Sequence, residues 1–400
     1  MAGRIAIVGG GPAGLIAAET LADAGAQVAV FEQMRSAGRK FLLAGRGGLN
    51  ITHTEPTEEL LDRYGAARPY LAPAIQAFGP EQLRQWSAGH NEVTFVGSSG
   101  RVFPQSFRAT PLLRSWLRRL DDRGVTLATQ HRWTGWDGAG SLEFDTVDGP
   151  RTIAADAVIF ALGGASWPRV GSDGAWAPLF VAAGIEVTAL APANTAVHVA
   201  WSTVLQERFA GTPIKNTVFS VGDQRVRGDA VVSEAGLEGG PIYALGPSLR
   251  SELATNGSAT LHLDLHPDLD LGRLTQRLSK RRPKSSLSSW LSSAQISPVA
   301  VALARETTAN RLPEDPAALA ALLKDLPLPV ASLASLDRAI STAGGISWAA
   351  LNSQYMLEQR PGTFIAGEML DWEAPTGGYL LQACFSTGVA AAQGVLEHLG

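Results

Sequence analysis

The chain has 400 residues, 45% of them hydrophobic and 18% charged, which is enough for a large core and predicts two or three domains. Its formal net charge of -4 argues against a protein that binds nucleic acid through overall charge. The single cysteine, Cys384, excludes an internal disulfide and any redox centre that needs a cysteine pair.

The same features predict a cytoplasmic protein with no membrane partner. No apolar run approaches the roughly 20 residues that a membrane-spanning helix needs. The first apolar run, Ile5–Val8, is short and is followed at once by glycines, so we expect no signal peptide. A reducing compartment also suits a chain with one cysteine.

Residues 4–32 combine a strand, a turn, a helix and a second strand. The apolar runs Arg4–Val8 and Gln27–Phe31 predict buried strands, and Leu15–Ala24 has a helical pattern. The turn after the first strand reads G-x-G-x-x-G, through Gly9, Gly11, Pro12, Ala13 and Gly14. With Glu32 closing the second strand, this order is typical of a dinucleotide-binding site. The alternative interpretation is a plain glycine turn between a strand and a helix.

Each part of this motif has a physical role. Gly9 allows the tight turn, Gly11 lets the backbone approach a pyrophosphate, and Gly14 lets the helix pack on the sheet. Free N–H groups at the helix start favour bound phosphate. Glu32 can accept hydrogen bonds from both ribose hydroxyls and repels a 2′-phosphate, so FAD or NAD fits better than NADP.

A basic, glycine-rich segment follows at residues 38–53. Its Arg39, Lys40 and Arg46 are expected to pair with phosphate, and a solvated basic loop is the alternative. A helical pattern then covers residues 57–89, before two short strands around the turn at 97–100.

The next elements include a helix and a small sheet. We expect Thr110 to cap a helix whose first residue is Pro111. The segments Val125–Ala128, Arg132–Trp136 and Ser141–Thr146 predict an antiparallel sheet.

A buried parallel strand is the second strong signal. Residues 157–162 form an apolar run that follows Asp156 and ends at Gly163 and Gly164. Parallel strands buried on both faces read as such runs, and ligands lie beyond their carboxyl ends. We therefore expect Ala161 and Gly163 to face a ligand.

The βαβ rhythm stops at Pro192. Short strands and then helices occupy the chain to about Ala343, and predict an inserted α+β domain. It carries the basic run Lys280–Lys284, which fits an exposed loop better than an RNA-binding patch. The expected domains are an FAD-binding domain over 1–191 and 344–400, and a substrate or cap domain over 192–343.

The C-terminal stretch returns to the first domain. A strand ends at Gly367 and Glu368, and a helical segment begins at Tyr379, with Thr376 as its expected N-cap. In a flavoprotein this arrangement places the carboxylate on the ribityl hydroxyls. The N–H groups of Gly378 and Tyr379 would then stabilise negative charge on the reduced flavin.

Several motifs together resemble the BaiN/YhiN-like family of FAD-dependent oxidoreductases, which has a glutathione-reductase-type FAD fold. The resemblance covers nearly the whole chain, and is carried by IVGGGPAGLIAAE, GRVFP, ALGGASWPRVGSDG, TAGGISW and GEMLDWEAPTGGYLLQ. The chain departs from the family where Gly-Arg-Cys-Asn reads Gly48-Leu49-Asn50, and where a common histidine is Glu234. These departures indicate a divergent subgroup of the family.

The resemblance implies an α/β fold: a Rossmann-like FAD-binding domain with an inserted α+β domain of β-barrel-like strands plus helices. The residues assigned to FAD are Gly9, Gly11, Pro12, Ala13, Gly14, Glu32, Gln33, Arg39, Lys40, Asn50, Arg132, Ala161, Gly163, Gly367, Glu368, Gly378, Tyr379 and Leu380. The weak candidates for a catalytic proton donor are Glu234 and Tyr379, with His53, Glu238 and Tyr243 eligible by type only.

These residues predict an FAD-dependent oxidoreductase. We expect hydride transfer between flavin N5 and a small apolar, enone-like substrate. No second glycine motif follows a strand, so either NAD(P)H visits the flavin transiently or the electrons come from elsewhere. A flavoprotein monooxygenase and an RNA-binding or RNA-modifying flavoprotein are the alternatives. We expect no metal, because the histidines lack ligand spacing and His262 and His266 lie in a strand-like run. The substrate and the oligomeric state are not encoded in these patterns.

Overall fold

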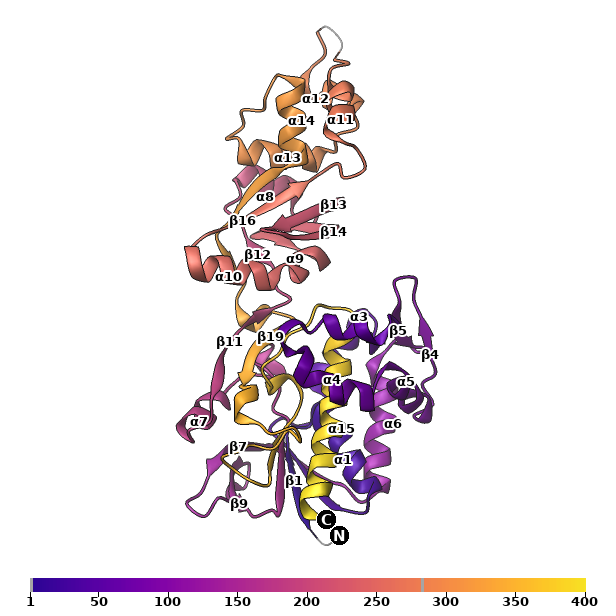
Figure 1. Ribbon diagram of the computed structural model, residues 1–400, viewed down its shortest axis with the longest axis vertical. Coiled ribbons are helices and arrows are strands. Elements are labelled where there is room, and N and C mark those ends of the chain that lie inside the picture. The colour runs from indigo at the N-terminus through magenta and orange to yellow at the C-terminus, as the bar shows by residue number, and fades with distance from the viewer. Residues whose placement is uncertain (1–2, 282–283) are drawn as a thin grey trace. The chain divides into compact units, whose positions relative to one another are not determined.

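The computed structural model describes residues 3–281 and 284–400, which form two compact units (Figure 1). Unit 1 comprises the chain up to Ala191 and again from Ile340 to Gly400, and unit 2 comprises Pro192–Ala339. The chain re-enters unit 1 before the expected residue 344, because Ser341–Ile346 pairs with a strand that ends unit 1. Within the basic run, Arg282 and Pro283 lie outside the described residues.

A five-stranded parallel sheet is the centre of unit 1. Its order is β20-β10-β1-β2-β6, and its strands are β1 (Arg4–Val8), β2 (Gln27–Glu32), β6 (Thr126–Thr129), β10 (Ala157–Phe160) and β20 (Thr363–Ile365). The parallel registers Val8↔Phe31 and Val8↔Phe160 bring the carboxyl ends of three strands to one edge. The fold-class prediction, a Rossmann-like α/β domain with an inserted α+β unit, is confirmed.

Strand β6 corrects one expectation. Its segment was expected to begin a small antiparallel sheet, but it pairs in parallel with β2, Phe31 opposite Ala128. The antiparallel sheet instead consists of β7 (His131–Trp136), β8 (Leu142–Thr146) and β9 (Gly149–Ile153). A short edge strand with alternating polarity can join either sheet, so the neighbouring strand decides the pairing.

Helices and two further small sheets complete unit 1. The sheets pair β3 (Thr52–His53) and β4 (Thr94–Val96) with β5 (Arg101–Pro104), and β11 (Val187–Ala193) with β19 (Ser341–Ile346). The helices are α1 (Pro12–Asp23), α2 (Arg39–Ala44), α3 (Thr57–Asp62), α4 (Arg68–Ala77), α5 (Pro80–Gly89), α6 (Ala109–Asp122), α7 (Ala177–Ala182) and α15 (Tyr379–Leu399). Helix α6 begins before the expected Thr110 cap, and its N-cap is Arg108, with no side-chain cap bond.

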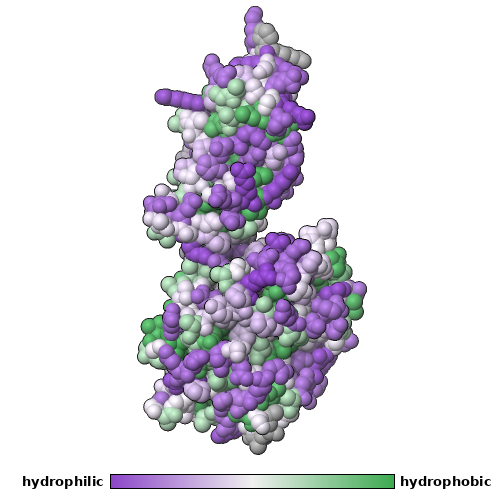
Figure 2. Space-filling view, viewed as in Figure 1, coloured by the Kyte–Doolittle hydropathy of each residue, from purple (hydrophilic) through white to green (hydrophobic). Residues whose placement is uncertain are grey.

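Helix α15 corrects the expectation about membrane-spanning runs. Among the described residues it is the one helix long and apolar enough to cross a membrane by length and composition, although 61% of its apolar window is buried. It packs beside α1, as Figure 1 shows. Figure 2 shows hydrophilic and hydrophobic residues intermingled on the visible face of unit 1. The apolar character of α15 is therefore explained by its place in the core of unit 1.

Unit 2 is an antiparallel sheet with helices and a core of its own. The sheet order is β17-β16-β13-β14-β15-β12-β18, formed by β12 (Val197–His198), β13 (Pro213–Val221), β14 (Gln224–Ser233), β15 (Gly236–Glu238), β16 (Ala259–Asp264), β17 (Leu326–Val330) and β18 (Ser332–Leu333). The helices are α8 (Thr203–Phe209), α9 (Gly240–Ala244), α10 (Gly246–Asn256), α11 (Leu271–Leu278), α12 (Leu287–Ser293), α13 (Pro298–Thr307) and α14 (Pro316–Lys324).

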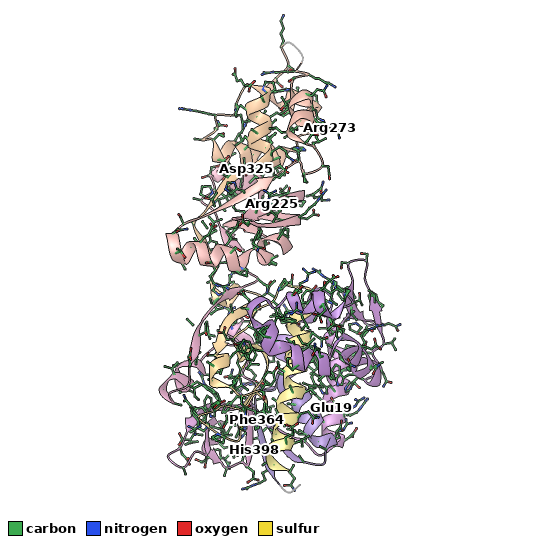
Figure 3. All side chains as sticks on the ribbon, in the orientation of Figure 1. Glu19, Arg225, Arg273, Asp325, Phe364 and His398 are labelled. Atoms are coloured by element: carbon green, nitrogen blue, oxygen red, sulfur yellow. The ribbon has the colours of Figure 1, made fainter. Side chains whose placement is uncertain are left out.

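A buried carboxylate joins three helices of unit 1. Glu19 of α1, labelled in Figure 3, accepts a hydrogen bond from Trp86 Nε1 at 2.9 Å and one from Arg119 Nη1 at 3.0 Å. His90 Nε2 lies 3.7 Å from the carboxylate. Burial raises the pKa of Glu19, but these partners outweigh burial and lower its pKa from 4.5 to about 2.

This pKa shift predicts a pH-dependent contribution to stability. Because the folded pKa lies below the unfolded one, ionised Glu19 stabilises the fold above pH 4.5, and this contribution is lost as the pH falls toward 2. We expect Glu19→Gln to lower the free energy of unfolding at pH 7 by roughly 3 kcal/mol. Denaturant titrations between pH 7 and pH 3 should show the difference from wild type shrinking in acid.

The exposed glutamate Glu143 provides the matched control. Glu143→Gln should leave the unfolding curve nearly unchanged at every pH, because the side chain is solvated. A wild-type to Glu19→Gln difference that stays constant down to pH 3 would contradict an ionised, stabilising Glu19.

Candidate functional site

A cavity of about 320 Å³ opens at the carboxyl ends of β1, β2 and β10. Thirteen of the residues assigned from sequence line it: Gly9, Gly11, Pro12, Ala13, Glu32, Gln33, Arg39, Lys40, Arg132, Ala161, Gly163, Gly367 and Glu368. This is the edge where ligands of open parallel sheets bind. Segments that are far apart in the chain therefore meet around one cavity.

The glycine turn forms one wall of this cavity. Gly9 has a φ of 114°, which favours glycine, and a Cβ on Gly14 would lie 2.0 Å from the Gly9 carbonyl oxygen. A Cβ on Gly11, in contrast, would meet no described atom within 4 Å. Gly11 is also the N-cap of α1 and offers no side-chain bond to the first helical N–H groups. These N–H groups at the cavity wall suit an anionic ligand.

Glu32 supplies a carboxylate at the end of β2. Its Oε2 accepts the Gly10 N–H at 2.9 Å and its Oε1 accepts the Met34 N–H at 2.8 Å. Burial raises the pKa of Glu32, and these two hydrogen bonds and the charge of Arg39 oppose that rise. Each carboxylate oxygen has a second lone pair, so Glu32 can still accept a bond from a ligand hydroxyl.

Lys40 and Glu368 form an ion pair in the cavity wall. Lys40 Nζ lies 2.6 Å from Glu368 Oε2 and 2.7 Å from Ser166 Oγ, although 328 residues separate the charged partners. Glu368 also accepts the Thr342 N–H at 3.0 Å. The pair links α2 to the 3₁₀ turn Gly367–Met369 and brings one positive and one negative group to the same part of the cavity.

Three residues that line the cavity each carry a buried polar atom with no hydrogen-bond partner among the described residues. These atoms are Arg39 Nε, Trp133 Nε1 and Ser172 Oγ. Leaving a buried polar group without a partner costs about 1–3 kcal/mol, so such groups are usually satisfied by a ligand or by water. The donors, the open glycine wall and the Glu32 acceptor fit a dinucleotide that presents phosphates and ribose hydroxyls.

Two of these residues were not assigned from sequence. Ser172 lies in the glycine-containing stretch Gly171–Gly174, and Trp133 lies on β7 next to the assigned Arg132. The glycines around Ser172 were the available signal. No sequence signal marked Trp133, because a tryptophan that faces inward from a strand usually belongs to the hydrophobic core.

Five assigned residues lie outside this cavity lining: Gly14, Asn50, Gly378, Tyr379 and Leu380. Asn50 Nδ2 donates to the carbonyls of Thr52 and Val102, while its buried Oδ1 has no partner among the described residues. Gly378, not Thr376, is the N-cap of α15. With a φ of 96° and a Cβ position 2.6 Å from the Thr52 backbone, Gly378 is required by close packing on β3.

Tyr379 takes part in a buried cluster at the start of α15. Its ring stacks on His53 with centroids 5.5 Å apart, and its carbonyl accepts the Tyr64 hydroxyl at 2.9 Å. Burial and the nearby carboxylate of Glu55 raise its pKa, so the phenol stays protonated. Arg63 binds Glu55 through two nitrogens, at 2.8 and 3.2 Å. The Tyr379 hydroxyl therefore keeps its proton and is able to donate it.

The other candidate donors lie in unit 2. Glu234 is exposed in the turn between β14 and β15, and Glu238 is exposed at the end of β15. Burial and the charge of Glu238 raise the pKa of Tyr243. Of these three, none lines the dinucleotide-like cavity of unit 1.

The described residues contain no group of three or more His, Cys, Asp or Glu placed to hold a metal ion. His262 Nδ1 lies 2.7 Å from Asp325 Oδ1, so this histidine has a surface carboxylate partner. Cys384 lines the cavity, and burial raises the pKa of its thiol to about 12, which keeps it neutral.

Comparisons with known proteins place these features in context. A family model described as "HI0933-like protein Rossmann domain" matches residues 3–394. The 3-dehydro-bile acid delta(4,6)-reductase of Clostridium scindens is 25% identical over 415 residues, covering 99% of both chains. A thiamine thiazole synthase of Methanosarcina barkeri is 32% identical over 118 residues, covering 28% of this chain and 45% of that protein.

Two solved structures resemble the whole chain at low sequence identity. The 3-ketosteroid delta1-dehydrogenase of Sterolibacterium denitrificans has a TM-score of 0.54 at 14% identity, covering 98% of this chain and 99% of that one. The open form of a flavocytochrome c3 fumarate reductase has a TM-score of 0.50 at 13% identity, covering 99% and 78%. At these identities the likeness shows a shared fold.

Proposed function

The chain belongs to the HI0933-like family of Rossmann-domain proteins, and from this premise we propose that it is an FAD-dependent oxidoreductase acting on a small, apolar, enone-like molecule. The observation that carries the proposal is the cavity at the sheet edge. It combines an open glycine wall, an uncapped helix start, the Glu32 carboxylate and three unpartnered polar atoms. Such a set suits FAD rather than FMN, because the Glu32 carboxylate and the N–H groups at the start of α1 fit an adenosine ribose and a pyrophosphate, which FMN lacks.

Different residues of the cavity would bind different groups of FAD. The N–H groups at the start of α1 and the guanidinium of Arg39 would hold the pyrophosphate, and Glu32 would accept the adenosine ribose hydroxyls. Glu368, on the opposite side, would accept ribityl hydroxyls while Lys40 balances its charge. When bound, FAD supplies hydride-transfer chemistry, and the chain orients it and excludes water.

The substrate class rests on the full-length relative. That protein is a 3-dehydro-bile acid delta(4,6)-reductase, which matches this chain over 99% of its length. A 3-ketosteroid delta1-dehydrogenase shares the fold. We propose NAD(P)H as the electron donor, a cytoplasmic location, and unit 2 as the part of the chain that covers the substrate.

The test begins with the cofactor of the purified protein. We expect a yellow protein whose acid-released chromophore is FAD, because FAD alone of the two flavin nucleotides uses both the phosphate and the Glu32 groups. Under anaerobic conditions NADH or NADPH should bleach the flavin absorbance, and an enone steroid should restore it. Chromatography of the chromophore and absorbance traces check both steps.

The possible contrary results separate the alternatives. FMN, or no flavin after FAD is supplied, would contradict the cofactor proposal. Reoxidation by oxygen with a hydroxylated product would favour a monooxygenase, and failure with every enone tried would contradict the substrate class. Tight RNA binding at physiological salt would favour an RNA-modifying flavoprotein.

A further inference from the structure

We propose that Ser172 and Trp133 are cofactor-binding residues: the Ser172 hydroxyl and the Trp133 indole N–H each form a hydrogen bond with the bound dinucleotide. This proposal rests on the proposed FAD function and extends it to two residues outside the glycine motif. Both residues line the cavity. They come from separate parts of the chain, the loop before α7 and strand β7.

Burial without a partner is the first argument. Trp133 is 6% exposed and Ser172 is 5% exposed, and neither polar atom has a hydrogen-bond partner among the described residues. Comparable groups nearby are satisfied by the protein itself. Trp176 Nε1 donates to the Gly163 carbonyl at 2.9 Å, and Ser166 Oγ accepts from Lys40 Nζ at 2.7 Å. The two unpartnered groups therefore point to a ligand as the missing partner.

The surroundings of Ser172 place its hydroxyl beside the predicted cofactor path. A Cβ built on Gly163 would lie 3.6 Å from Ser172 Oγ and 4.0 Å from Glu368 Oε2, so both polar groups flank the same glycine turn. Gln33 Nε2 donates to the Gly171 carbonyl at 2.7 Å and holds the loop to the end of β2. A ligand lying against Gly163 can thus reach the hydroxyl and the carboxylate together.

Trp133 adds a directional requirement. Its indole nitrogen can only donate, so the ligand must present an acceptor such as a phosphate, ribose or ring-nitrogen atom. The ring packs on Phe160 and Phe180, with centroids 4.7 and 5.5 Å away, which fixes the side chain in the wall. A donor held in a fixed position beside the cavity favours one ligand position over others.

Ser172→Ala tests the hydroxyl with little change of volume. FAD titrated into the FAD-free protein should bind about two- to tenfold more weakly, the worth of one neutral hydrogen bond. The melting temperature of the FAD-free variant should equal or exceed that of wild type, because no protein bond is lost. Ser166→Ala, which removes a bond that exists, should instead lower this melting temperature by about 2–4 °C.

Trp133→Phe has a matched control in Trp116→Phe. Trp116 is also buried with an unpartnered indole nitrogen, but it does not line the cavity. Both substitutions should lower the melting temperature by similar amounts through lost packing, whereas only Trp133→Phe should weaken FAD binding.

The outcomes separate the assignment of Ser172 and Trp133 from the proposed FAD-dependent function on which it rests. Wild-type protein that binds no FAD would overturn the proposed function itself. Wild-type protein that binds FAD, with unchanged affinity in both Ser172→Ala and Trp133→Phe, would overturn only the assignment of these two residues. A lowered melting temperature of FAD-free Ser172→Ala would also count against it, since it would reveal a structural bond.

Discussion

Replacing Gly11 with valine should abolish FAD binding while the protein still folds. Gly11 lines the cavity, has an ordinary φ of -84°, and leaves open space where a Cβ would stand. A valine side chain would occupy the space in which the backbone now allows close approach of a phosphate. We expect the affinity for FAD to fall by more than about a hundredfold, equivalent to roughly 2.7 kcal/mol.

Titration of FAD-free protein with FAD, followed by flavin fluorescence, measures this effect. Gly138→Val is the matched control, since a Cβ there also meets nothing within 4 Å and Gly138 lies outside the cavity lining. Its affinity for FAD should equal that of wild type. A Gly11→Val protein with a wild-type melting temperature and wild-type affinity would show that the ligand does not approach this turn.

Glu32→Ala should weaken FAD binding about ten- to hundredfold, because a charged acceptor of ligand hydroxyls is lost. The structure adds a second consequence. Glu32 also accepts the N–H groups of Gly10 and Met34, so the FAD-free variant should melt at a lower temperature than wild type. These two bonds therefore tie Glu32 to the stability of the turn as well as to the affinity for FAD.

Glu32→Gln separates the two effects. The amide keeps the shape and one carbonyl acceptor but removes the charge, so it should retain more stability than Glu32→Ala and still bind FAD less tightly than wild type. Calorimetry of the FAD-free proteins and titration with FAD provide both values. Equal affinity in all three proteins would mean that Glu32 supports the turn and does not face the ribose.

The local pattern of the sequence was sufficient for several elements. The strand Arg4–Val8, the glycine turn and the helix that follows it are recognisable because burial, backbone freedom and helical periodicity each leave a signature over a few residues. Helix α15 begins at the predicted Tyr379 for the same reason.

Tertiary structure alone decided which distant segments meet. Strand β6 became an edge of the parallel sheet because β2 offered it an unpaired edge. Lys40 and Glu368 pair because β1, β10 and β20 bring residues 328 apart to one end of the sheet. The unpartnered groups of Trp133 and Ser172 are visible only once every neighbour is in place. Sequence periodicity indicates whether an element is buried or exposed. Which strands and side chains become neighbours depends on the order of the strands in the sheet and on the path of the connecting loops, and no local pattern encodes these.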